Sequence, residues 1–160
     1  MDMSRVNIEA FIEKLERFPE QLETAVSGLT IEQLTTPYLE GEWTIAQNVH
    51  HVADAHINGY IRVKLTLTED VPPLKPYDQD KWAISPDANN VDLDTSFHIL
   101  RGVHQRWGML FRSLTDPEWT RSGNHLEDGI VTVADLLTIY VAHGEAHLDQ
   151  IARTLAASQQ

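Results

Sequence analysis

Two groups of histidine are the residues in this chain whose type and spacing could do chemistry. The chain has eight histidines, and three of them, His50, His51 and His56, fall within seven positions of the segment EWTIAQNVHHVADAH. A second group, His143 and His147, lies near the other end of the sequence. Neutral imidazole is the commonest side-chain ligand for metal ions. The two groups therefore either meet around a metal ion or are ordinary polar residues of two helices.

His143 and His147 are one helical turn apart, so their side chains would lie on the same face of a helix. In the segment YVAHGEAHLDQI that face is apolar, because Tyr140 precedes the pair and Ile151 follows it. Two imidazoles that point inward from one turn can share a metal ion at roughly 2.0–2.1 Å each. The same spacing is common in helices that bind no metal, so two core or partly exposed histidines are the alternative.

The residues around the pair exclude several other kinds of site. In a zinc-protease helix a glutamate directly follows the first histidine, whereas here Gly144 holds that place and Glu145 points to the far side of the helix. The Glu-x-x-His pairs of di-iron bundles are absent from the sequence. It also has no Gly-rich phosphate loop and no G-x-S-x-G nucleophile motif. A metal held by the pair would be mononuclear and would need at least one further ligand.

The first histidine group offers that ligand, but periodicity leaves its identity open. On a helical wheel His51 shares a flank with Gln47 and Asn58, whereas His56 lies nearer the middle of the apolar arc. His50 projects in the opposite direction. Periodicity alone therefore favours His56 as the buried residue, with His51 at the margin, and does not decide which of the two meets His143 and His147.

Four helices are predicted to position these residues. Apolar residues recur at steps of three and four in the ranges 7–29, 44–68, 94–114 and 132–157. Pro19 interrupts the first stripe, which predicts a kink or a break into two shorter helices there. The pattern predicts an all-α fold, an up-and-down four-helix bundle, formed by a single domain over residues 1–160.

Caps and connections refine this prediction. Thr44 can cap the second helix, whose weakest interior position is Gly59, and Asp135 stands at the third position of a capping box that begins the last helix. Residues 69–92, between the second and third helices, form a long loop of the kind that often serves as a functional lid. Residues 116–132 are expected to hold a short turn or hairpin.

Composition narrows the classes of partner. The net charge is −12, which repels phosphate backbones and anionic lipid, so nucleic acid and membrane surfaces are not expected as partners. The chain has no cysteine, which excludes disulfides, thiolate metal sites and a cysteine nucleophile. No apolar run is long enough to cross a bilayer, and the first residues lack the pattern of a signal peptide. A cytoplasmic location is expected.

With these features in view, the chain resembles the DinB superfamily of metal-binding four-helix bundles, and within it the YfiT-like proteins, which are labelled as metal-dependent hydrolases. The resemblance covers nearly the whole chain. It is carried by TPYLEGEWTIAQNVHHVADAHINGYIRVKLTLTED, by KPYDQDKW in the long loop, by HQRWGMLFRSLTDPEW, and by YVAHGEAH. One departure is the segment GEA between the last two histidines, which is often rich in histidine in relatives.

The resemblance implies a metal site with three histidine ligands. In the family the first ligand is the second member of the histidine pair, eight residues after a tryptophan, which corresponds to His51 when counted from Trp43. The other two correspond to His143 and His147. The resemblance further implies zinc or nickel as the divalent metal, with open positions for water. Some related bundles transfer the thiol of bacillithiol or mycothiol onto electrophiles.

Three residues are candidates for catalytic or supporting roles. Asp54 and Gln47 lie near the His51 flank at helical spacing, so either could fix the tautomer of an imidazole, and a solvated polar edge is the alternative. Tyr77 could contact substrate from the long loop or simply hold that loop on the bundle. The catalytic group stays unknown among these three. Further candidates for contacts around the site are Lys75, Asp78, Trp82, Arg62 and Lys64.

The remaining histidines are expected to have structural or supporting roles, or to lie at the surface. His56 is the fallback ligand, and it either lines the cavity beside the metal or is a core histidine bonded to a backbone carbonyl. His104 faces inward and serves packing or support of the site. His50 reads as a solvated or internally bonded helix residue, and His98 and His125 read as surface residues.

A three-histidine metal site with an open position suits two reactions. It can supply hydroxide for hydrolysis, or it can bind a low-molecular-weight thiol as the thiolate and direct the sulfur at an electrophile. We therefore expect a metal-dependent hydrolase or thiol S-transferase that acts on small molecules. The alternative is a non-catalytic metal-binding bundle. A homodimer is also expected, because bundles of this kind often pair.

Overall fold

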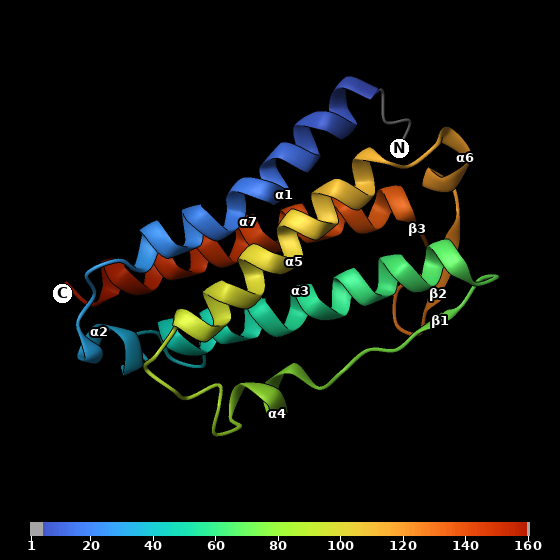
Figure 1. The fold of residues 1–160 in the computed structure, drawn as a ribbon. Helices are drawn as coiled ribbons and strands as arrows, with labels where there is room; N and C mark the ends of the chain where they lie inside the picture. Colours follow the sequence, from blue (N-terminus) through green and yellow to red (C-terminus); the bar gives the residue numbers. More distant parts are fainter. Residues whose placement is uncertain (1–4, 160) are drawn as a thin grey trace.

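The computed structural model describes residues 5–159 and confirms a four-helix bundle (Figure 1). The four long helices are α1 (Arg5–Val26), α3 (Ile45–Thr68), α5 (Asp94–Arg112) and α7 (Val133–Ala157). The short helices between them are α2 (Ile31–Thr35), α4 (Gln79–Ala83) and α6 (Asp116–Trp119). Among the described residues, no helix is both long enough and apolar enough to cross a membrane.

The order of the helices around the bundle departs from the expected up-and-down arrangement. Both α1 and α3 pack against α5 and α7, so α1 and α3 lie diagonally opposite each other. Helices α3 and α5 run in the same direction, and the long loop that connects them returns along the side of α3 that faces away from α5 (Figure 1). The length of this loop is the physical reason for the difference, because a parallel neighbour requires a connection that spans the whole helix.

Helix α1 continues through Pro19, so the expected break does not occur. A proline lacks the N–H that would bond to the carbonyl of the residue four positions earlier, and in α1 that residue is Leu15. The Leu15 carbonyl instead accepts a hydrogen bond from Nδ1 of His104 at 2.6 Å. The group that Pro19 leaves unpaired is thus satisfied by a side chain of α5.

The predicted helix starts are confirmed. Thr44 is the N-cap of α3, and its side chain accepts from the main chain of Gln47, whose side chain accepts in return from the main chain of Thr44. Thr132 and Asp135 form the same reciprocal capping box at the start of α7. These caps fix where the helices begin, and therefore which side chains face the interior further along.

A small sheet closes one end of the bundle. Strand β1 (Pro73–Leu74) pairs in parallel with β2 (Ser122–His125), which pairs antiparallel with β3 (Gly129–Thr132). The β2–β3 hairpin confirms the expectation for residues 116–132, and Gly129, with φ of +80°, makes its turn. Strand β1 belongs to the long loop, so pairing with β2 holds one part of that loop on the body of the protein.

The core consists of two apolar clusters separated by a layer of histidines. On α5, Leu100 belongs to one cluster, Trp107 to the other, and His104 lies between them. On α7, Val141 belongs to the cluster of Trp107 and Ile151 to the cluster of Leu100, and His143 and His147 lie between them in the sequence. The candidate chemistry therefore sits at mid-height in the bundle, between the two apolar clusters.

Helices α3 and α7 approach closely at Gly59, and this contact generates a first prediction. A Cβ atom at Gly59 would lie 2.5 Å from Cε1 of Tyr140, whose ring is buried against Trp107 and His56. Gly59→Ala should lower the free energy of unfolding by about 1–2 kcal/mol, because overpacking costs ~1–3 kcal/mol and alanine regains up to ~1 kcal/mol of helix propensity. Urea unfolding followed by circular dichroism measures this difference.

Gly102→Ala is the matched control. Gly102 is also interior to a long helix, but a Cβ there meets nothing within 4 Å. That substitution should raise the free energy of unfolding by up to ~1 kcal/mol. An equal gain in both variants would show that α3 and α7 are not in close contact at Gly59.

Candidate metal centre

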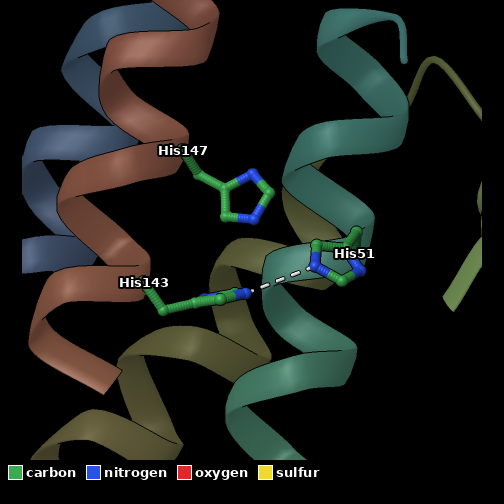
Figure 2. Close-up of side chains that lie close together, drawn as sticks. All are labelled: His51, His143 and His147. Atoms are coloured by element: carbon green, nitrogen blue, oxygen red, sulfur yellow. Dashed lines mark hydrogen bonds between the residues drawn. The ribbon is translucent and has the colours of Figure 1, made fainter. Parts of the chain in front are cut away.

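Three histidines from two helices converge at mid-height in the bundle. His51 comes from α3, and His143 and His147 come from α7, with their rings turned toward one another (Figure 2). One ring nitrogen from each residue lies within 4.8 Å of the others. His51 is buried, whereas the other two are half-buried. The structure thus brings together the three residues that the family resemblance named, and one side of the group is accessible.

The spacing of the nitrogens suits a tetrahedral ion. Nε2 of His51 and Nε2 of His143 are 3.4 Å apart, which is long for a hydrogen bond. Two nitrogens bound tetrahedrally at roughly 2.0–2.1 Å from zinc would be about 3.3 Å apart. The side chains present therefore fit a divalent ion, since His51 and His143 already stand at ligand spacing and His147 is within reach.

The orientation of His147 is set by a residue that the sequence reasoning missed. Nδ1 of His147 lies 2.8 Å from Oδ1 of Asn48, whose Nδ2 donates to the Thr44 carbonyl at 3.0 Å. Because Oδ1 can only accept, Nδ1 of His147 carries the proton and Nε2 keeps its lone pair for a ligand role. Asn48 is fully buried in the apolar arc of α3. The signal available in the sequence was the amide side chain of Asn48 among the apolar residues of that arc.

Burial keeps these imidazoles neutral. Loss of hydration, with a smaller contribution from the nearby His147, lowers the pKa of His51 to about 3 and that of His143 to about 3. Burial likewise lowers the pKa of His147 to about 4. Neutral imidazole is the form that binds a metal, so the protein presents binding-competent rings well below neutral pH.

His56, the fallback ligand, lies behind His143 rather than beside the accessible side of the group. Its Nε2 is 3.1 Å from Nδ1 of His143, so it contacts the ring nitrogen that faces away from His51. It is fully buried, as periodicity predicted, but it is not part of the converging set of three.

A cavity of about 190 Å³ adjoins the group. His143 forms part of its wall, together with Arg62, Tyr77 and Tyr140. The guanidinium of Arg62 donates to Oη of Tyr140 at 2.9 Å and to the Lys75 carbonyl at 2.8 Å. Within residues 5–159 Arg62 forms no ion pair with a carboxylate, so its charge is available to a bound molecule.

The three candidates for catalytic roles occupy different positions. Gln47 is held by its capping box and donates to the Ala83 carbonyl at 2.9 Å, so it ties α3 to the long loop. Asp54 is half-buried on α3, and desolvation is the main cause that raises the pKa of its carboxyl. Tyr77 lines the cavity, and burial raises the pKa of its phenol to about 12. Its ring packs on Trp82 at 4.4 Å between centroids.

The other histidines divide into bonded and exposed residues. His50 is buried, with Nδ1 2.8 Å from Oγ of Ser96 and Nε2 2.8 Å from the Asn90 carbonyl. His98 is exposed, as expected. The expectation of a surface position for His125 is wrong: it is buried on β2 and lines the cavity, because strand pairing turns it inward.

Comparisons with known proteins agree with this geometry. The model of the DinB superfamily matches residues 14–151. YfiT of Bacillus subtilis, described as a probable metal-dependent hydrolase, is 40% identical over 150 residues, which cover 93% of this chain and 84% of that protein. A protein of Oceanobacillus iheyensis, also named as a candidate metal-dependent hydrolase, is 37% identical over 150 residues, covering 94% of this chain and 87% of its own.

Two solved structures are similar in fold. The YfiT structure superposes with a TM-score of 0.92 at 39% identity, covering 96% of this chain and 88% of that one, and it is described as a four-helix bundle of unusual topology. A mycothiol-dependent maleylpyruvate isomerase shares the fold at a TM-score of 0.60 and 17% identity, covering 90% of this chain and 60% of its own. The resemblance in the sequence motifs is confirmed: the chain belongs to the DinB superfamily and is similar to YfiT.

Proposed function

We propose that this protein is a metal-dependent enzyme that uses a mononuclear three-histidine site to act on small molecules. The observation that carries the proposal is the convergence of three neutral imidazoles beside a cavity that one of them, His143, helps to line. Relatives named as metal-dependent hydrolases support it. Zinc or nickel is the proposed metal, because three nitrogen donors without a thiolate or carboxylate suit these borderline ions.

A divalent ion with an open position lowers the pKa of a bound water or thiol and so makes a nucleophile available at neutral pH. The protein's own residues do the rest. His51, His143 and His147 would hold the ion, and Asn48 fixes the ring of His147. Trp43 packs beside the site, with its ring 4.5 Å from the ring of His51 between centroids.

The cavity favours an anionic or strongly polar small molecule. Arg62 has N–H groups beyond the two that bond to Tyr140 and Lys75, and its charge can orient a carboxylate. Tyr77 keeps its proton at neutral pH and can donate a hydrogen bond. A pure metal-storage bundle has no need of such a lined cavity beside the metal, which makes the non-catalytic alternative weaker.

Two nucleophiles suit this site, and they differ in their need for a base. Attack by water requires proton removal by a nearby group, whereas a metal-bound thiol has already lost its proton. Glu127, which is exposed, is the one carboxylate in the described lining of the cavity, and Asp54 lies outside that lining. This favours transfer of a low-molecular-weight thiol, and the name of the mycothiol-dependent fold relative supports it. The names of the YfiT-like relatives support hydrolysis.

The expected homodimer and the cytoplasmic location stay predictions.

Metal content is the direct test of the proposed site. Untagged protein should carry close to one equivalent of zinc or nickel by plasma mass spectrometry, and His51→Ala, His143→Ala and His147→Ala should each lose most of it. The reason is that an open three-ligand site becomes a weak two-ligand site. His50→Ala is the control, because His50 is a buried histidine of the same helix that bonds to Ser96 and Asn90 instead. Unchanged metal content in His147→Ala would refute the site.

Cobalt substitution distinguishes the two reactions. Protein reloaded with Co²⁺ should develop sulfur-to-metal charge-transfer absorption in the near ultraviolet when a low-molecular-weight thiol is added, because the thiolate occupies the open position. The His147→Ala variant should show none. If thiols leave the spectrum unchanged while small esters or amides are hydrolysed, the hydrolase reading holds and the transferase reading fails. Absence of both effects would indicate a non-catalytic metal-binding bundle.

A further inference from the structure

A row of three imidazoles leads away from the candidate metal site into the core. Nδ1 of His143 lies 3.1 Å from Nε2 of His56, and Nδ1 of His56 lies 2.7 Å from Nε2 of His104. The row ends where Nδ1 of His104 meets the Leu15 carbonyl at 2.6 Å. His56 and His104 are almost completely buried. Rings of Phe18 and Trp107 flank them and hold them in place.

The carbonyl at the end of the row sets the direction of every hydrogen bond in it. A carbonyl can only accept, so Nδ1 of His104 must carry a proton. Burial lowers the pKa of His104 to about 4, so the ring is neutral at pH 7 and its Nε2 has a lone pair. Nδ1 of His56 must therefore donate to it, and Nε2 of His56 must accept from Nδ1 of His143. The end result is that Nε2 of His143 is left without a proton, facing His51.

Reversal of this order at any one ring is costly. It would place two N–H groups or two lone pairs face to face at about hydrogen-bond distance, among buried rings where an unmade hydrogen bond is costly. The row therefore behaves as a unit, with all three rings pointing the same way.

The acceptor exists because of the proline in α1. In an unbroken helix the Leu15 carbonyl would already bond to the N–H of residue 19, but Pro19 has none. The carbonyl is thus free to accept from His104 of α5. Pro19 on α1 therefore influences the tautomer of His143 on α7. The influence passes through His104 and His56, which lie between them.

We propose that His56 and His104 are positioning residues: through the Leu15 carbonyl they hold His143 in the tautomer that leaves Nε2 free, and in this way they set the affinity of the site for its metal. This inference rests on the proposed metal site. Neither residue touches the ion or a substrate, and both act through the ring of His143. The plain alternative is that the two buried rings only fill space and contribute stability.

The first experiment reads the tautomers in the metal-free protein and needs no metal or activity. Long-range ¹H–¹⁵N correlation spectra of the full chain, stripped with a chelator, should show His56, His104 and His143 each protonated at Nδ1. An Nε2–H tautomer at any of the three would overturn the inference. It would leave the proposed function untouched, since metal content tests that separately.

The second experiment breaks the row at its far end. His104→Phe keeps a ring of similar size but removes both the donor and the acceptor. Zinc affinity, measured by competition with a chromophoric chelator, should fall on the order of tenfold, the lower end of the effect seen for residues bonded to ligating histidines. In the same variant the resonances of His143 should show Nε2–H appearing in the metal-free state.

Two further variants separate positioning from stability. His104→Gln offers an oxygen and an N–H in the same order, so it should recover most of the zinc affinity lost in His104→Phe. His50→Phe removes a buried histidine whose ring also makes two hydrogen bonds, to Ser96 and Asn90, outside the row. It should lower stability without lowering zinc affinity. An equal loss of affinity in His50→Phe, or none in His104→Phe, would show that the rings serve only packing.

Discussion

The central constraint in this molecule is that buried imidazoles must be neutral and must have partners for their ring nitrogens. A charged or unpaired polar group in an apolar interior costs several kcal/mol, so each ring needs a specified donor or acceptor. The protein meets this need with two oxygens that can only accept a hydrogen bond. The Leu15 carbonyl orients the row that ends at His143, and Oδ1 of Asn48 orients His147. The orientations of both histidines on α7 follow from these two oxygens.

The same constraint explains why the site lies at mid-height. A polar layer that divides the core into two apolar clusters lowers the apolar area that each cluster can bury, so its buried polar atoms need hydrogen-bond partners, which the row from His143 to the Leu15 carbonyl supplies. The rings of Phe18 and Trp107 border this layer and exclude water from it. On the accessible side the layer opens into the cavity lined by His143 and Arg62, which is where a small molecule can approach.

Much of the framework could be predicted from the sequence. The helix starts at Thr44 and Thr132 are local events, determined by side chains within three positions of each cap, and they are confirmed. The short strand at Pro73–Leu74 could not be predicted, because two residues carry no alternation, and the order of helices depends on the path of a loop rather than on any pattern.

The site shows the limit of periodicity more clearly. The apolar arc correctly favoured His56 as more buried than His51, but burial says nothing about convergence on a point, and His56 lies behind the three rings that converge. His51 came from the family resemblance. The part played by the Leu15 carbonyl was out of reach, because a main-chain oxygen leaves no mark in a pattern of side chains. Only Pro19, one turn later, hinted at it.

The bond between Leu15 and His104 also bears on how the molecule is assembled during synthesis. The two residues are 89 positions apart, so the carbonyl is made early and waits for α5 before it finds its donor. His143 follows later still, 92 residues after His51. A growing chain therefore cannot present the complete set of rings until its last long helix has emerged and packed against the first. In a zinc finger the metal organises an unfolded chain. Here the proposed ligands lie on two long helices 92 residues apart, so the proposed site depends on the packing of those helices.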